Sequence, residues 1–228
     1  MQIETVVAPL LGALCHVLAE PDGRCVVVDP GAGVVDDVAA LVRRAGWTPV
    51  AVLLTHGHVD HTWDAAAVGD RFGVPVHVHE GDAYRLADPV GSLGPLGHQL
   101  AAMTGLDAPP APADVRTFDA AAGHETPLAL GDDDAVQVTA LHSPGHTQGS
   151  TVYLVRDAAG SPVALTGDVL FAGSIGRTDL PGGDDAAMGR TLARLTTLDP
   201  ATRVLPGHGP TSTVAAELAG NPYLRPHR

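Results

Sequence analysis

The sequence predicts an α/β protein in which two β-sheets pack against each other and helices cover their outer faces. Apolar runs typical of buried strands alternate with segments of helical spacing in the first half of the chain. The second half is again rich in strands and carries its helices near the end, so each half contributes to a sheet and to an outer layer. With 228 residues, 45% of them hydrophobic and 17% charged, the chain can bury such a core, and we expect one domain over residues 1–228.

The first half begins with two strands joined by a turn around Pro9 and Gly12. The run RCVVVDPG at 24–31 is a continuous apolar strand closed by a turn. Helical spacing follows over 34–46, where Gly46 is a favourable C-cap residue. The same patterns predict strands over 49–55 and 74–80, and between them a helix over 62–73.

Residues 87–125 differ from the rest of the chain because they are rich in Pro, Gly and Ala. We expect a long excursion there with one short helix near 96–104, and an excursion of this length is usually a functional loop or a lid. The elements that follow show the same patterns as the first half. They are strands over 125–131, 135–142, 150–156, 162–168 and 202–207, a glycine-rich loop over 172–183, and helices over 184–198 and 212–220.

The charge pattern excludes several classes of function. The formal net charge is −13 and all 13 basic residues are arginine, so no lysine is present for a Walker-type phosphate loop or for Schiff-base chemistry. This acidity disfavours nucleic acid as a partner, and no apolar run reaches the ~18 residues that a membrane span needs. Cys15 and Cys25 are the only cysteines, and no positive charge precedes Arg24 as a signal peptide would require. We therefore expect a cytoplasmic protein with reduced thiols.

The densest polar motif is LLTHGHVDHTWD at residues 53–64. Within six positions it contains His56, His58, Asp60 and His61. The motif directly follows a predicted buried strand, and α/β folds place their sites at the carboxyl ends of strands. Four such side chains so close together suit two adjacent metal ions better than one. Imidazole and carboxylate ligands favour zinc, with iron or manganese as alternatives, over magnesium or calcium.

Three later segments supply further candidate ligands. HSPGHTQGS contains His146 after a Pro-Gly turn, LTGDVLF contains Asp168 at a strand end, and LPGHGP contains His208 between two glycines. Glycine allows the backbone to approach a ligand closely. Each segment lies directly after or before an apolar strand, so the sequence predicts seven candidate metal ligands.

The order and spacing of these motifs resemble the metallo-β-lactamase superfamily, and within it the shorter bacterial form of glyoxalase II, the hydroxyacylglutathione hydrolases. The motifs that carry the resemblance are THGHVDH, SPGHTQGS, TGDVLFAGSIGRTDLPGGD and LPGHGPTST, and the likeness extends over about residues 25–224. The resemblance implies a four-layer αββα sandwich with a dinuclear metal site along one edge. Full-length glyoxalase II also carries a C-terminal helical domain. Here only 20 residues follow His208, so no separate domain of that kind is expected.

The resemblance also implies how the ligands are divided between two metals. The first metal would be held by His56, His58 and His146, and the second by Asp60, His61 and His208, with Asp168 bridging them. Asp60 and Asp168 would be the carboxylates that take part in catalysis at this centre.

Other residues would support the site or bind the substrate. The resemblance places Asp29, in the VVDPG turn, behind the ligands, and His142 is expected to make a supporting hydrogen bond rather than to bind metal. Arg177 lies in the glycine-rich loop, two positions before Asp179. It either pairs with Asp179 to hold the loop or contacts an anionic group of the substrate.

The main hypothesis is hydrolysis of a small-molecule thioester of the S-2-hydroxyacyl-glutathione type. Two metals would share a water whose pKa falls toward ~7, and the resulting hydroxide would attack the acyl carbonyl. The alternatives are a persulfide dioxygenase that uses one iron on the same fold, and a non-catalytic metal-binding module. His208 favours the hydrolase because the second metal needs it. We expect a monomer or a small homo-oligomer; the metal, the thiol carrier and the acyl group stay open.

Overall fold

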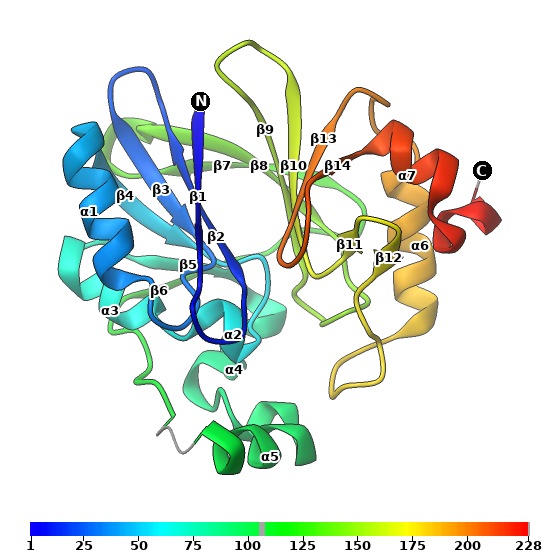
Figure 1. Ribbon diagram of the computed structural model, residues 1–228, viewed down its shortest axis with the longest axis horizontal. Coiled ribbons are helices and arrows are strands. Elements are labelled where there is room, and N and C mark those ends of the chain that lie inside the picture. The colour runs from blue at the N-terminus through cyan, green and yellow to red at the C-terminus, as the bar shows by residue number, and fades with distance from the viewer. Residues whose placement is uncertain (105–107, 228) are drawn as a thin grey trace.

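Two six-stranded β-sheets lie face to face at the centre of the molecule (Figure 1). The structure is a computed structural model and describes residues 1–104 and 108–227. The first sheet has the order β1 (Gln2–Val7), β2 (Leu14–Ala19), β3 (Arg24–Val28), β4 (Thr48–Leu53), β5 (Val76–His79), β6 (Val115–Phe118). The second has the order β14 (Ser212–Thr213), β13 (Arg203–Pro206), β10 (Pro162–Gly167), β9 (Thr151–Arg156), β8 (Val136–His142), β7 (Glu125–Leu130).

Helices cover the outer face of each sheet. On the first sheet lie α1 (Val35–Ala45) and α3 (Ala65–Phe72), and on the second lie α6 (Asp185–Leu195) and α7 (Val214–Gly220) (Figure 1). This is the expected four-layer αββα sandwich. The shorter elements are α2 (Val59–Thr62), α4 (Ala83–Ala87), α5 (Pro95–Thr104) and the 3-10 helices η1 (Glu80–Asp82), η2 (Gly91–Leu93), η3 (Asp132–Asp134), η4 (Pro222–His227).

Three apolar clusters, one between each pair of layers, hold the sandwich together. In β3 the side chains of Cys25 and Val27 belong to the cluster under α1, whereas those of Val26 and Val28 belong to the cluster between the sheets. Because both faces of β3 are buried, its sequence is a continuous apolar run without alternation. The two-sheet fold predicted from such runs is confirmed.

Two segments differ from the sequence-based prediction. The helix expected over 62–73 begins later, as α3 at Ala65, with Asp64 at its N-cap, and a separate short helix, α2, precedes it within the histidine motif. The backbone N–H of Asp64 donates to the Pro30 carbonyl, and its carboxylate accepts hydrogen bonds from the N–H groups of Gly33 and Val34. These bonds join the start of α3 to the start of α1.

The segment 87–125 contains a strand that the sequence analysis missed. The helix expected near 96–104 is α5, but β6 also lies in this segment and pairs parallel with β5. Most residues of β6 are exposed at the sheet edge, so they show no apolar run. Residues 105–107 of the segment lie outside the described residues. A short hairpin is formed by β11 (Leu170–Phe171) and β12 (Ser174–Ile175). Its second strand, β12, lies within the glycine-rich loop over 172–183.

Backbone hydrogen bonds join the two sheets along one edge. Leu14 N–H donates to the Gly207 carbonyl at 2.8 Å, and Thr151 N–H donates to the Thr55 carbonyl at 2.7 Å. These bonds place the loop that follows β13 beside the start of β2, and the loop that follows β4 beside the start of β9. No helix within residues 1–104 and 108–227 is long and apolar enough to cross a membrane.

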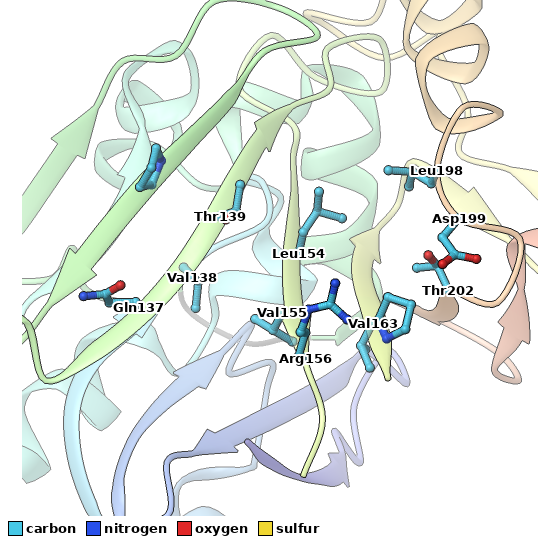
Figure 2. A pocket seen from close by; sticks show the side chains of 12 residues that line it. Gln137, Val138, Thr139, Leu154, Val155, Arg156, Val163, Leu198, Asp199 and Thr202 are labelled. Atoms are coloured by element: carbon cyan, nitrogen blue, oxygen red, sulfur yellow. The ribbon is translucent and has the colours of Figure 1, made fainter. Parts of the chain in front are cut away.

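A groove of about 440 Å³ lies at the other end of the second sheet's strands (Figure 2). Thr139 from β8 and Leu154 and Arg156 from β9 line it, together with Leu198 (Figure 2). Arg156 pairs with Pro162 at the start of β10, whereas the motif residue Asp168 follows the end of that strand. None of the groove's described lining residues is histidine or cysteine, so the groove is separate from the predicted metal site.

Tyr153 provides a buried polar link between the sheets. Its side chain is fully buried on β9, and its hydroxyl donates to the Leu54 carbonyl at 2.8 Å. Tyr153→Phe should lower the free energy of unfolding by about 1–2 kcal/mol, because it leaves a buried carbonyl without this donor. Denaturant titration measures the change. Tyr223→Phe, at an exposed side chain, is the matched control and should stay within about 0.5 kcal/mol; equal effects of the two substitutions would contradict the interpretation.

Candidate metal centre

The seven candidate ligands meet at the edge where the sheets are joined. They come from the loop after β4 and the adjoining α2 (His56, His58, Asp60, His61), the β8–β9 loop (His146), the end of β10 (Asp168) and the loop after β13 (His208). Strands β10 and β13 are parallel, so their carboxyl ends lie at the same edge. The topology therefore brings together residues that are up to 152 positions apart, from 56 to 208.

The ligand atoms form two groups, each compact enough to surround one ion. In each group the three ligand atoms lie within 4.8 Å of one another; the groups are His56, His58, His146 and Asp60, His61, His208. Asp168 lies between the groups. Its Oδ2 is 3.8 Å from His146 Nε2, and its Oδ1 is 3.3 Å from His61 Nε2. The two groups contain the residues that the family resemblance assigns to the first and the second metal, and their role as ligands stays a prediction.

The first group contains imidazole nitrogens that need a partner. The Nε2 atoms of His56, His58 and His146 are buried, and within the described part of the chain they have no hydrogen-bond partner. His146 Nδ1 donates to the Arg177 carbonyl at 2.8 Å, which leaves a lone pair on Nε2. Buried polar atoms are normally satisfied. Three converging imidazole nitrogens without a partner therefore fit a divalent cation, and the donor set suits metals that accept imidazole nitrogen.

The protonation of the two groups differs. Burial, with a contribution from His146, lowers the pKa of His58 to about 3, and burial also lowers the pKa values of His56 and His146. For His61 burial acts downward, but the carboxylates of Asp168 and Asp60 outweigh it and raise its pKa well above the usual value. The hydrogen bond to Asp60 raises the pKa of His208. The second group therefore holds protons more readily than the first.

Asp29 lies directly behind the second group. Its side chain is 2% exposed and accepts hydrogen bonds from His61 Nδ1 (3.1 Å), from the Thr55 N–H (2.7 Å) and from the Thr55 hydroxyl (2.6 Å). With Nδ1 donating to Asp29, His61 presents Nε2 toward Asp60 and His208. The backbone of Asp29 has φ 51°, a left-handed conformation that is uncommon outside glycine. Asp29 therefore contacts a candidate ligand, and a role in supporting a bound metal stays a prediction.

His142 lies outside both ligand groups. Its ring stacks on that of His79, with centroids 3.8 Å apart, and its Nε2 lies 2.8 Å from the Gln148 carbonyl. Donation to this carbonyl holds the loop that carries His146. His142 thus makes a hydrogen bond rather than joining a ligand group, as expected. The bond acts on His146 only through the backbone of the loop.

A buried ion pair that the sequence analysis missed joins several site loops. Asp82 and Arg85 are both fully buried and lie 3.2 Å apart. Asp82 accepts hydrogen bonds from the N–H of Gly57, between His56 and His58, and from the hydroxyl of Thr147 and the N–H of Gly149, on the His146 loop. The pair thus holds both segments that supply the first group. In the sequence the only signal is an Asp and an Arg three positions apart, a spacing that is also common on exposed helices.

Arg85 extends this network to two further segments. Its guanidinium donates to the carbonyl of Pro181 at 2.6 Å, to the carbonyl of Ser92 at 3.3 Å and to the side chain of Gln148 at 3.0 Å. The glycine-rich loop and the segment before α5 are thereby fixed relative to the His146 loop. The charges of Asp82 and Arg85 are both buried, so loss of either side chain would leave the other as an unpaired buried charge.

Arg177 is exposed beside the ligands. Its guanidinium makes two hydrogen bonds to the Asp179 carboxylate, at 2.7 and 2.8 Å, which corresponds to the loop-fixing alternative. Its side chain also lines the pocket that contains His58 and Asp168. Contact with a substrate anion stays a prediction.

The αββα fold and the two ligand groups define the class of protein, a four-layer sandwich with a candidate site for divalent metal ions at one edge. The model of the Metallo-beta-lactamase superfamily matches residues 9–208, and the chain belongs to this superfamily.

Relatives and solved structures agree with this assignment. Rv2581c of Mycobacterium tuberculosis is 41% identical, with 95% of each chain covered. YqgX of Bacillus subtilis, named a probable metallo-hydrolase, is 36% identical, covering 89% of this chain and 88% of its own. The hydroxyacylglutathione hydrolase GloC of Haemophilus influenzae is 30% identical, with 98% of each chain covered.

Two crystal structures are similar over nearly the whole chain. BLEG-1, a B3 metallo-beta-lactamase, has a TM-score of 0.80 and 31% identity, covering 98% of this chain and 100% of its own. TTHA1623 in a di-iron-bound form has a TM-score of 0.77 and 32% identity, covering 96% of this chain and 99% of its own. A site for divalent metal ions is consistent with both.

The role of Asp82 can be tested by Asp82→Asn. The amide would face the donors of Gly57, Gly149 and Arg85 without a full set of acceptors, so the loops carrying the first ligand group should shift. Metal affinity of that group should fall about 10- to 100-fold. Competition with a chelator measures it, best in an Asp60→Ala background where the second group is incomplete. Glu80→Gln, exposed in the same turn, is the control; equal affinities of the two variants would refute a positioning role.

The two metal sites should differ in their response to pH. The pKa values of His61 and His208 are raised and that of His58 is lowered to about 3, so an ion entering the second group competes with protons more strongly than an ion entering the first. As the pH falls from about 8 to about 6, affinity for the second ion should decrease more steeply than affinity for the first. Calorimetry in buffers of different ionisation enthalpy would count the protons released. Identical pH slopes for the two ions would be inconsistent with this protonation pattern.

Proposed function

We propose that the protein is a dinuclear metal-dependent hydrolase that cleaves thioesters. The observation that carries the proposal is the pair of three-membered ligand groups with Asp168 between them. A relative named as a hydroxyacylglutathione hydrolase, similar over 98% of each chain, supports a thioester as the substrate class. Imidazole and carboxylate ligands suit zinc, and the di-iron form of a structural neighbour makes iron the alternative.

When bound, two divalent ions at such a centre supply an activated water and positive charge that stabilises a developing oxyanion. The chain's own residues hold this centre in place. Asp29 orients His61, the Arg177 carbonyl orients His146, and the buried pair of Asp82 and Arg85 fixes the loops of the first group. In the overall reaction the water oxygen bonds to the acyl carbon, the carbon–sulfur bond breaks, and the thiol leaves with a proton.

No protein nucleophile is required. Cys15 and Cys25 are both fully buried in the core under α1. Burial raises the pKa of the Cys15 thiol well above its usual value and that of Cys25 to about 12. Thiolates, which are the reactive form, are therefore scarce at neutral pH. This supports direct attack by water rather than an acyl-enzyme route through cysteine.

The assembled second group favours the hydrolase over an oxidoreductase that uses a single iron. Asp60, His61 and His208 converge within 4.8 Å of one another, and a mononuclear enzyme would not need this set. Small thioesters would then be the partners of the site, and we propose that the protein acts as a monomer or small homo-oligomer in the cytoplasm.

The proposal is tested by metal content and turnover measured together. Protein purified without chelator should contain about two metal ions per chain and should hydrolyse S-lactoylglutathione. Asp60→Ala removes the carboxylate of the second group, so the metal content should approach one and the rate should fall about 100-fold or more. Asp70→Ala, exposed on α3, is the control and should behave as the parent. One iron per chain with oxygen-dependent turnover would instead support the dioxygenase.

A further inference from the structure

Leucine side chains line the pocket that contains the candidate metal ligands. The pocket has a volume of about 240 Å³ and includes His58, Asp60, His146 and Asp168. Beside these polar residues it is lined by four leucines, which we call the leucine wall: Leu11, Leu93, Leu96 and Leu180. Apolar side chains therefore adjoin the position where the reacting carbonyl would lie.

The leucine wall is assembled from three distant parts of the chain. Leu11 lies in the turn between β1 and β2, Leu93 and Leu96 lie in η2 and α5, and Leu180 lies in the loop that carries Arg177. Leu11 and Leu96 are 42% and 37% exposed, so the wall includes apolar surface that is open to solvent. The leucines are therefore not the core-facing stripe of a single amphipathic helix. Exposed apolar surface at a polar site is typical of a ligand contact.

The conformation of Leu11 is an independent observation. Its φ of 68° is left-handed, a conformation that is uncommon for a bulky residue and is normally occupied by glycine or asparagine. Strained residues of this kind cluster at functional sites. A leucine at this position is unfavourable for the turn itself, and its side chain lines the pocket.

A second pocket provides space for the polar part of a substrate. It has a volume of about 580 Å³ and shares Arg177 with the first. Thr178, Asp179 and Tyr223 also line it, so its surface carries hydroxyl and charged groups. The larger, more polar space suits a thiol carrier, and the smaller one suits a short apolar group.

We infer that the leucine wall binds the apolar acyl chain of a thioester whose polar carrier lies over Arg177. The inference rests on the proposed thioester hydrolysis and names its substrate class, short-chain acyl thioesters. A 2-hydroxyacyl group fits this surface less well, because its hydroxyl would give up hydrogen bonds to water beside leucine side chains.

Two series of neutral substrates test the inference. In the first, the S-acetyl, S-butanoyl and S-hexanoyl esters of N-acetylcysteamine vary only the acyl chain. We expect kcat/KM to rise by up to about fourfold per methylene, the factor that corresponds to burying one methylene group. In the second, S-acetyl esters of alkyl thiols of increasing length vary only the carrier, and kcat/KM should change little. A dependence on length that follows the thiol instead of the acyl chain would overturn the inference.

Matched variants in one turn assign the effect to the wall. Leu10 and Leu11 are adjacent and similarly exposed, at 45% and 42%, but only Leu11 lines the pocket. Leu11→Asn should flatten the acyl-length dependence, because asparagine accepts the left-handed conformation but removes the apolar contact. Leu10→Asn should retain the dependence. Leu180→Asn tests the wall from a second segment and should also flatten it.

Binding without turnover provides a second readout. In a ketone analogue a methylene replaces the thioester sulfur, so the ligand cannot be hydrolysed. Its Kd, measured by calorimetry, should decrease by up to about fourfold per acyl methylene in the parent protein and much less in Leu11→Asn.

The outcomes separate the inference from the proposed function. If metal-loaded protein hydrolyses no thioester, including S-lactoylglutathione, the proposed function fails, and the ketone series still decides whether the wall binds an acyl chain. If thioesters are hydrolysed but the rates are independent of acyl length, the function stands and the inference is wrong. A preference for S-lactoyl over S-butanoyl on the same carrier would also refute it.

Discussion

The surrounding structure depends on the close packing of seven histidine and aspartate side chains at one edge of the sandwich. The loops that carry these side chains are held in place by the residues behind them. Imidazole nitrogens of His56, His58 and His146 converge in a buried space, and the carboxylates of Asp60 and Asp168 lie beside them. Such groups lose their contacts with water on folding, which is costly unless other groups satisfy them. Each ligand loop is therefore held by hydrogen bonds from behind, and bound cations would satisfy the converging nitrogens.

Two buried acidic residues hold the ligand loops, one for each group. Asp29 accepts three hydrogen bonds around Thr55 and His61, next to the second group. Asp82 accepts hydrogen bonds from both loops of the first group and is neutralised by Arg85. Low local dielectric strengthens such bonds and also makes an unpaired member costly. The geometry of the centre thus depends on residues that do not contact the metal positions.

The surroundings of the centre divide it into an apolar side and a polar side. The leucine wall comes from the β1–β2 turn, the segment around α5 and the glycine-rich loop, while Arg177 and its partner Asp179 line a larger pocket of mixed polar and apolar surface. When many proteins share one fold, their substrates are bound mainly by the connecting loops, which differ from protein to protein. A shared metal centre with different loop linings is consistent with relatives named as a metallo-hydrolase, a glutathione thioester hydrolase and a beta-lactamase.

Local sequence patterns are sufficient to predict the layer order and the candidate ligands. Apolar runs such as 24–28 mark strands buried on both faces, and a cluster such as His56, His58 and His61 has few structural explanations. Tertiary structure alone decided the pairing of Asp82 with the Gly57 and Gly149 loops, the edge strand β6 and the leucine wall. These features join residues that are far apart in the chain. In addition, an exposed edge strand or a single leucine produces no periodic pattern in the sequence from which it could be predicted. Local periodicity reports burial, whereas the partner of a buried charge depends on how the loops meet in space.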